Sequence, residues 1–394
     1  MDDSKKTRGA WGLVFLFFVL FPFGQILKID LNILSVLLAI NPIDLVALTS
    51  VFLLRKEVLL RSPRVYKSLL SFIVIAIFSL IFSLVYFRLS EILIGLLYLL
   101  RLIGYFSLSL VFFNLVKKNK CSKPLLLDAL ILVGLFVGIF GWIQYFFLPD
   151  LRPFLIWGWD DHLFRLTGTF LDPGFTGIIL VFGFLAASTK FLQTHKVSLA
   201  LLLFFLLISL AFTYSRSSYL SFFVGTFTIA LISKAKSFAL ISTAIFISLI
   251  LILPRPEGEG VKLERTSSIY PRIESYQEGL KIFKKFPVFG IGFNNLCAFR
   301  GESPRDSHAC GGIDASLLTV LATTGTVGFL IFVNFVFNLV KSLTPGSSNS
   351  LLALSSLAAL GVHSLFSNSL FYPWVMGWMG VLLAISLIDK RIKG

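Results

Sequence analysis

The fold is decided by the stretch VSLALLLFFLLISLAF-TYSRSS-YLSFFVGTFTIALI, which runs from Val197 to Ile232. Two apolar runs, 197–212 and 219–232, flank the polar hexapeptide Thr213–Ser218, which contains Arg216. Because an apolar helix needs about 20 residues to cross a bilayer, we interpret each run as most of a membrane span. An arginine at the end of a span is costly unless an anion or a water-filled cavity meets it. The hexapeptide therefore predicts a functional turn between two spans.

The composition of the whole chain is typical of a multi-pass membrane protein. Of its 394 residues, 56% are hydrophobic and 14% are charged, whereas a soluble domain has roughly 25% charged residues. On a soluble protein the net charge of +15 would suggest nucleic acid. Here we interpret it as the basic bias of cytoplasmic loops, so we expect no nucleic-acid partner. The first apolar run, Trp11–Phe23, lacks a clear small-residue cleavage site and is interpreted as a span.

Hydropathy predicts an all-α fold, a transmembrane helical bundle of about twelve spans in one domain over residues 1–394. The predicted spans are 11–27, 33–54, 69–87, 92–116, 125–148, 171–189, 197–213, 219–233, 237–253, 313–340, 350–370 and 373–388. In the second of them, the polar stretch Asn41-Pro42-Ile43-Asp44 predicts a kink or an interruption. With the N-terminus inside, lysines and arginines gather in the inner loops, so both termini are expected in the cytoplasm.

The only long polar segment, 254–312, is predicted to be an extracytoplasmic loop that is partly helical. Within it, 272–286 has the apolar spacing of an amphipathic helix that lies on the membrane or on the bundle, and Pro287 ends it. The predicted apolar stripe consists of Ile273, Tyr276, Leu280 and Phe283. The following Gly290-Ile291-Gly292 lacks the strand and helix of a dinucleotide site, so it predicts a tight turn.

The predicted topology places the polar chemistry on the outer face of the membrane. Loop 149–170, the turn at Arg216, loop 254–312 and the turn at 371–374 all fall on that face. ATP and nucleotide sugars are not available there. An enzyme with this topology therefore needs an activated substrate that is delivered in the membrane.

Four dispersed motifs, in order along the chain, resemble those of the O-antigen ligase and polymerase family of membrane glycosyltransferases. They are Arg165-Leu-Thr-Gly-Thr-Phe-Leu-Asp-Pro-Gly, Thr213-Tyr-Ser-Arg-Ser-Ser, Arg272 through Pro287-Val-Phe-Gly-Ile-Gly, and Ser307-His308 followed by Leu317–Gly328. The resemblance covers most of the last 230 or so residues, and the first 150 or so match in hydropathy only. The chain departs from the family pattern at Ala309, where the family usually has Asn, and at Tyr276, where it often has Trp.

The resemblance implies a GT-C-like, multi-pass glycosyltransferase of the bacterial inner membrane whose active site is extracytoplasmic. Such an enzyme moves a glycan from a polyprenyl (undecaprenyl) pyrophosphate to an acceptor hydroxyl. As an O-antigen ligase in lipopolysaccharide biosynthesis it would use the lipid A-core as acceptor, and as a polymerase it would use a lipid-linked repeat. The sequence leaves these two open. Its expected partners are the lipid-linked donor, the glycan acceptor and membrane lipids.

The resemblance also implies roles for individual residues. Arg216 and Arg272 bind the pyrophosphate, with Arg165 as a third and Arg265 as a weaker candidate, and His308 activates the acceptor. Guanidinium groups can hold phosphate oxygens in pairs, and the outer segments contain no Asp-x-Asp pair. We therefore expect metal-independent chemistry without a cofactor. The simpler alternatives are a headgroup anchor for Arg216 and a helix-surface charge for Arg272.

A transporter of lipid-linked sugar is the alternative from another class, because it too needs arginines in the membrane. Transporters often have internal repeats and charged residues at the middle of the bilayer. This chain has no recognisable internal repeat, and its polar residues gather at the predicted outer face. The sequence therefore favours the glycosyltransferase.

Three further polar residues lie in or beside the predicted spans. His162 follows an aromatic and acidic loop that either lines a sugar site or forms an interfacial belt. His363 lies inside a span, where we expect a buried polar contact. Arg101 also lies inside a span, and its expected partner is Asp44, Asp128 or a cavity.

The three cysteines give no metal motif. Cys297 and Cys310 fall on the predicted outer side and bracket His308, whereas Cys121 is predicted to be cytoplasmic. An oxidising compartment permits a disulfide between the outer two. The sequence leaves that disulfide open, because it does not give the distance between them.

Overall fold

The computed structural model describes residues 3–33, 36–54, 56–157, 159–302, 312–343 and 346–388. The longer helices are α1 (Asp3–Leu20), α4 (Arg64–Phe82), α5 (Leu93–Lys117), α6 (Lys123–Phe147), α7 (Pro173–Thr194), α8 (Val197–Ala211), α9 (Arg216–Ser233), α10 (Lys236–Ile252), α11 (Tyr270–Lys285), α13 (Ser316–Ser342), α14 (Ser348–His363) and α15 (Pro373–Ser386). The short elements are β1 (Ile29–Ile33), β2 (Val36–Ile40), α2 (Pro42–Thr49), α3 (Lys56–Leu60), α12 (Leu296–Arg300) and the 3₁₀ turns η1 (Phe21–Leu27), η2 (Ser50–Leu53), η3 (Ser83–Val85), η4 (Arg152–Trp157), η5 (Gly168–Phe170) and η6 (Glu259–Val261).

The protein is a helical, multi-pass membrane protein. In the described residues, 6 helices are long and apolar enough to cross a membrane, and α2 with η2, α8, α10 and α15 are shorter apolar helices. The predicted spans 219–233 and 350–370 correspond to α9 and α14, whose sequences contain several serines. The twelve-span count and the GT-C-like class stay predictions.

The predicted span at 33–54 is interrupted, as its polar stretch indicated, and its first part is not helical. Its beginning belongs to an antiparallel hairpin in which Ile29 pairs with Ile40, and its remainder forms the short helix α2 and the turn η2. The break falls at Asn41, as the polar stretch predicted. Pro42 fits the first turn of a helix because it needs no hydrogen-bond acceptor there. Asp44 also accepts a hydrogen bond from the backbone N–H of Asn41 at 3.3 Å, which starts a new helix.

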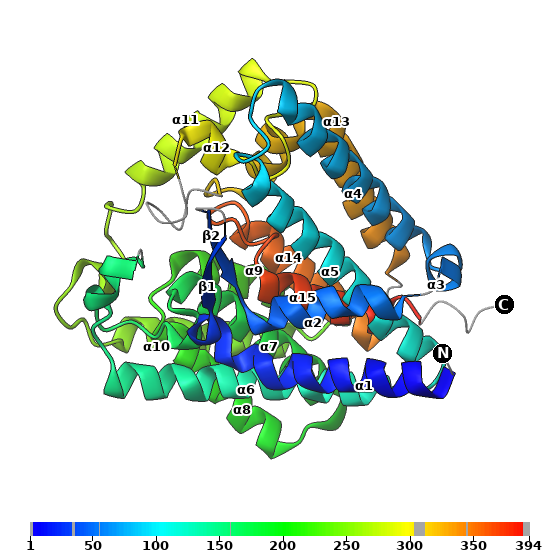
Figure 1. Cartoon of the computed structure of the whole chain (residues 1–394). Coiled ribbons are helices and arrows are strands. Elements are labelled where there is room, and N and C mark those ends of the chain that lie inside the picture. The colour runs from blue at the N-terminus through cyan, green and yellow to red at the C-terminus, as the bar shows by residue number, and fades with distance from the viewer. Residues whose placement is uncertain are drawn as a thin grey trace.

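Four helix pairs make the most extensive contacts, and three of them join helices that are distant in sequence. The pairs are α9 with α14, α5 with α15, α4 with α13 and α6 with α7. A Cβ added to Gly134 of α6 would lie 2.8 Å from the Cα of Gly183 in α7, so these two backbones touch. In Figure 1, α4 and α13 lie side by side, with α11 and α12 at their upper end.

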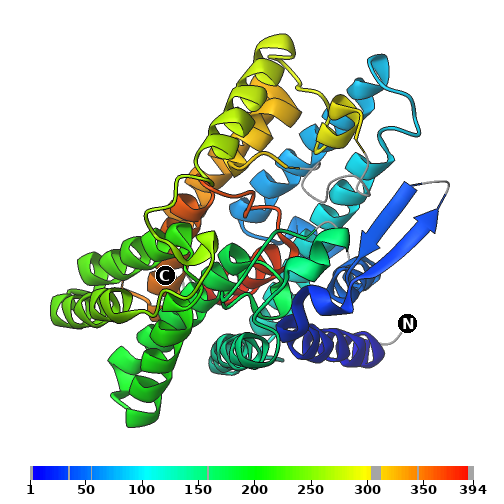
Figure 2. The ribbon, with the colours of Figure 1, turned by 90° about the vertical axis from the view of Figure 1, so that its left-hand side faces the viewer.

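The polar loops lie at one end of the molecule. Figure 1 shows the residues near 150–165 and 254–269 on its left, opposite the beginning of α1 and α3 on its right. Figure 2 turns that left side toward the viewer, with the β1–β2 hairpin at the right and α11 alongside α13 at the top. The two loops that the sequence assigns to one membrane face therefore share one side of the fold.

The segment 287–292 forms the predicted tight turn and fits against a kink in α13. Gly290 has φ +67°, and Gly325, inside α13, has φ +66°. A side chain at either glycine would collide with the other segment's backbone. Ile291 donates its N–H to the carbonyl of Ala322 at 3.1 Å, across the kink. This turn sets where α11 ends relative to α13.

The predicted amphipathic helix is confirmed as α11. Two residues of its predicted stripe, Ile273 and Leu280, are 44% and 47% exposed, so they do not pack into the bundle. Ile282, which lies outside the stripe, is buried and contacts the small cluster around Ile313, at the beginning of α13. The face toward the bundle therefore includes Ile282 and Gly279, where α11 closely approaches Leu318.

Arg101 in α5 has its predicted partner in Asp44. Its Nε lies 3.1 Å from Oδ1 and its Nη2 lies 2.7 Å from Oδ2, so the pair is bidentate. The hydroxyl of Tyr105 donates to the same carboxylate at 3.2 Å. The other acid considered, Asp128, pairs with Lys190. The buried carboxylate therefore fixes α2 against α5.

We expect Asp44→Asn to lower the free energy of unfolding by about 3–5 kcal/mol, because it leaves the charge of Arg101 buried without a counterion. The double variant Asp44→Asn, Arg101→Leu should recover much of this loss. Unfolding in detergent, followed by intrinsic fluorescence, measures both.

Asp128→Asn is the matched control, since its half-exposed pair should contribute at most about 1 kcal/mol. Equal losses from Asp44→Asn and Asp128→Asn would contradict the special role of the buried pair.

Candidate functional site

The hexapeptide Thr213–Ser218 forms the predicted turn between α8 and α9. Tyr214 adopts the left-handed conformation with φ +50°. Ser215 is the N-cap of α9 and accepts a hydrogen bond from the N–H of Ser218 at 3.4 Å. Thr213, Tyr214 and Ser215 are buried. The turn therefore presents backbone carbonyls and hydroxyls in a protected place.

Arg165 ties the loop 149–170 to this turn. Its Nε donates to the carbonyl of Thr213 at 3.0 Å, and its Nη2 donates to the carbonyl of Tyr214 at 3.3 Å. The side chain is only 7% exposed. Burial, followed by the nearby charge of Arg265, lowers the pKa of Arg165 to about 9, so the guanidinium stays charged at neutral pH.

Arg216 connects loop 254–269 to the same turn. Its Nη1 donates to the carbonyls of Leu263 at 3.1 Å and Arg265 at 2.8 Å, and its Nη2 donates to the hydroxyl of Ser268 at 2.8 Å. In return, Nη2 of Arg265 donates to the carbonyl of Tyr214 at 3.1 Å. Burial and then the charges of Arg216 and Arg272 lower the pKa of Arg265 to about 10.

Arg272 completes the group of predicted arginines. It lies in the first turn of α11, half-buried, and its guanidinium carbon is 5.9 Å from the ring centre of Phe366. Its positive charge contributes to the lowered pKa of Arg265. No hydrogen bond or ion pair joins Arg272 to another residue within the described ranges. Its N–H groups are therefore available to an anion.

Asp160, His162 and Asp172 form an acidic and imidazole cluster beside Arg165. Their ligand atoms lie within 4.8 Å of one another, a spacing that could hold a metal ion. Burial, followed by the charge of Arg165, lowers the pKa of His162 to about 4, so its imidazole is neutral. The sequence missed this cluster because its members come from two different segments.

His363, at the end of α14, has the buried polar contacts predicted for it. Its Nδ1 is 2.6 Å from the hydroxyl of Ser369, and its Nε2 is 3.4 Å from the hydroxyls of Ser217 and Ser218. The ring is fully buried. His363 therefore joins α14 to the first turn of α9, at the two serines that follow Arg216 in the chain.

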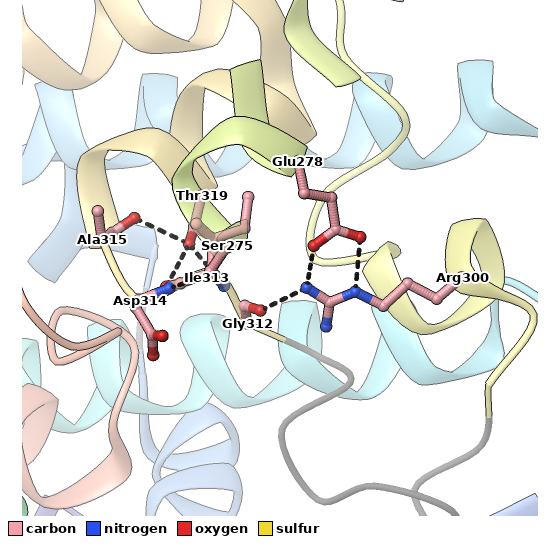
Figure 3. A network of polar contacts seen from close by, with 8 residues as sticks. All are labelled: Ser275, Glu278, Arg300, Gly312, Ile313, Asp314, Ala315 and Thr319. Atoms are coloured by element: carbon pink, nitrogen blue, oxygen red, sulfur yellow. Dashed lines mark hydrogen bonds and ion pairs between the residues drawn. The ribbon is translucent and has the colours of Figure 1, made fainter. Parts of the chain in front are cut away.

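The predicted catalytic residue His308 lies outside the described residues, as does Cys310. The chain before and after that stretch is held by the contacts in Figure 3. Arg300 makes a bidentate pair with Glu278 of α11, at 2.9 Å and 2.6 Å, and its Nη2 also donates to the carbonyl of Gly312 at 3.1 Å. Cys297, in α12, is buried and disulfide-bonded.

Asp314 follows that stretch and lies beside α11. Its N–H donates to the hydroxyl of Ser275 at 3.1 Å, and Figure 3 shows its carboxylate turned away from this contact. Burial raises the pKa of Asp314, although the charge of Arg272 opposes the rise. The sequence did not single out Asp314 or the Arg300–Glu278 pair, since neither belongs to a recognisable motif.

The structure thus brings Arg165, Arg216, Arg265 and Arg272 together from loop 149–170, α9, loop 254–269 and α11. Like charges raise one another's electrostatic energy when they are buried together. Such a group is suited to an anion with several oxygens, which removes that repulsion and accepts charge-assisted hydrogen bonds. A pyrophosphate has this chemistry.

One family model matches the chain over residues 201–333, and it is described as O-Antigen ligase. The matched stretch begins in α8, ends in α13 and includes Arg216, Arg265 and Arg272. It confirms the resemblance to the O-antigen ligase and polymerase family that the motifs indicated. No curated protein sequence matches the chain.

We expect Arg216→Lys to loosen the loop around Leu263–Ser268, because lysine cannot reproduce the fork of contacts that Arg216 makes. The free energy of local opening should fall by about 1.5–3 kcal/mol, the range for a hydrogen bond to a charged group. Hydrogen exchange of the amides in this loop should accelerate by roughly ten- to a hundredfold.

Arg255→Lys is the matched control, because Arg255 makes only an exposed pair with Glu264 at 3.4 Å. Unchanged exchange in Arg216→Lys would mean that other contacts hold the loop.

Proposed function

We propose that this membrane protein transfers a glycan from a polyprenyl pyrophosphate to an acceptor hydroxyl on the outer face of the bacterial inner membrane. We place it as an O-antigen ligase whose acceptor is the lipid A-core. The observation that carries the proposal is the convergence of Arg165, Arg216, Arg265 and Arg272, the last three of which lie within the O-antigen ligase match at residues 201–333. The donor and the acceptor are part of the proposal.

The leaving group explains the need for several arginines. As the acceptor oxygen bonds to the anomeric carbon, the bond from that carbon to the phosphate oxygen breaks, and the pyrophosphate keeps the electron pair. The growing negative charge is stabilised by guanidinium groups that are already in place. Arg272, which has no hydrogen bond within the described ranges, contacts the phosphate oxygens directly. Arg165, Arg216 and Arg265 keep their backbone contacts and supply the positive field, so this step needs no metal ion.

The acceptor hydroxyl must lose its proton in this step. We assign His308 as the base, because an unperturbed imidazole titrates near neutral pH. His308 lies six residues before Asp314, and an extended chain of that length reaches about 20 Å. Asp314 is beside α11 and within the electrostatic influence of Arg272, which supports this assignment.

The membrane placement follows from the charges and from the arrangement of the loops. Loops 149–170 and 254–312 are joined through the turn at Tyr214, so both lie on the same side of the bilayer. The basic residues of the loops predict that this side is extracytoplasmic and that both termini are cytoplasmic. A donor carried on a membrane lipid is then delivered directly to the arginines.

An apolar pocket between α4, α5, α13, α14 and α15 suits part of the polyprenyl chain. Its lining is almost wholly apolar and includes Phe72, Phe106, Phe332 and Met379. Leu370 and Phe371 also line it. They follow Ser369 in the chain, and the hydroxyl of Ser369 is hydrogen-bonded to His363. We assign the pocket to the lipid tail because its lining is apolar.

We expect Arg272→Ala to reduce glycan transfer by roughly a hundred- to a thousandfold, because a charge that faces the leaving group is lost. The assay uses the purified protein in proteoliposomes, with a polyprenyl pyrophosphate-linked glycan and lipid A-core. Lys281→Ala, on the exposed side of the same helix, is the matched control.

Unimpaired transfer by Arg272→Ala would defeat the proposed donor site. A product that lengthens on its lipid carrier when no lipid A-core is present would instead identify a polymerase.

We expect the rate of transfer to rise with pH as the base loses its proton, because a histidine base works only when it is neutral. The variant His308→Ala should lose this rise with pH and most of the rate of transfer. His195→Ala, an exposed histidine after α7, should keep the profile of the unchanged protein. A pH profile that His308→Ala leaves unchanged would transfer the role of base to another residue, with Asp314 the first to test.

A further inference from the structure

The cluster of Asp160, His162 and Asp172 has no place in the proposed transfer step. Asp160 and His162 belong to the loop after η4, and Asp172 is the N-cap of α7. One ligand atom from each lies within 4.8 Å of the other two. Two segments that are separated by the buried residues around Arg165 therefore meet at these three side chains.

The imidazole of His162 lacks the partners that a buried ring requires. The side chain is 8% exposed, and neither ring nitrogen has a hydrogen-bond partner within the described ranges. Buried polar atoms are almost always hydrogen-bonded or bound to a ligand, because leaving one unpaired is costly. His162 is therefore arranged for a ligand that the two neighbouring carboxylates also favour.

The neighbouring side chains indicate that this ligand is a metal cation. Asp172 uses Oδ1 to accept the N–H of Phe175 at 2.7 Å, which leaves its second oxygen for another bond. Asp160 is exposed and gives access from solvent. Arg165 and Arg265 both act on His162, so the two carboxylates face two positive charges, and it is the donor set that favours a metal. An imidazole nitrogen and two carboxylates can all donate lone pairs to one metal ion.

We propose that Asp160, His162 and Asp172 bind one Zn²⁺ ion. Imidazole favours zinc and its first-row neighbours, whereas Mg²⁺ and Ca²⁺ prefer all-oxygen ligands. Three protein ligands with one open position, filled by water, are a common arrangement for zinc. The ion fastens the loop at Asp160 to the beginning of α7, next to the contacts of Arg165 with the turn.

This site is independent of the proposed transfer reaction, and no step of that reaction passes through the ion. Its role is to hold loop 149–170 in place. The test therefore measures metal binding and thermal stability, and not transfer. A protein without zinc could still be a ligase, and a protein with zinc could still fail to transfer glycan.

The experiment uses the full chain, purified in detergent without a histidine tag and stripped with a chelator. ZnCl₂ is titrated in while bound zinc is measured by elemental analysis and unfolding by differential scanning fluorimetry. We expect about one Zn²⁺ per chain and a higher unfolding temperature with zinc. His162→Phe, which fills the buried site, should weaken binding at least tenfold.

Asp160→Asn should also weaken binding at least tenfold, and because Asp160 is exposed it keeps the proposal testable if His162→Phe does not fold. Asp161→Asn, the exposed neighbour outside the cluster, is the matched control and should bind zinc as the unchanged protein does. No zinc in the unchanged protein, or equal binding in Asp160→Asn and Asp161→Asn, would overturn the proposal. An equal response to MgCl₂ would overturn the assignment to zinc.

Discussion

The end of the molecule that carries the polar loops depends on hydrogen bonds from buried and half-buried guanidinium groups to backbone carbonyls around Tyr214. Arg165 and Arg265 both donate to its carbonyl, and Arg216 donates back to the backbone of the loop that carries Arg265. A loop without regular structure has many carbonyls to satisfy, and an arginine can serve several of them from one side chain. Two long loops are thus joined to one turn by hydrogen bonds, in addition to the buried apolar side chains of Leu166 and Val261.

The same contacts concentrate positive charge, which is unfavourable in the protein alone. Burial and like charges both disfavour the charged forms of Arg165 and Arg265, and they therefore lower the pKa values of these two residues. A site that holds charge at a cost is poised for a ligand of opposite sign. In the proposed function, backbone attachment and anion binding use one set of side chains, and Arg272 differs because its hydrogen-bonding groups are uncommitted within the described ranges.

Several features could be predicted because they depend on residue type and spacing alone. The apolar runs located α4 to α10 and α13 to α15, amphipathic spacing located α11, and the hexapeptide at Arg216 located the turn between α8 and α9. Other predictions needed information that spacing does not carry. Residues 33–54 are apolar enough for a span, but the hairpin pairing of Ile29 with Ile40 takes up the beginning of that stretch. The buried face of α11 depends on Gly279, where the beginning of α13 approaches.

The sequence by itself determined that the chain is a membrane protein, which of its residues carry unusual charge, and which family its motifs resemble. Hydropathy and short motifs are local properties, so they can be read along the chain. The tertiary structure alone decided that Asp44 is the partner of Arg101, and that Asp160 and His162 meet Asp172. These pairings join segments that are separate in sequence. Their distances are set by how the helices pack, and no local pattern records that packing.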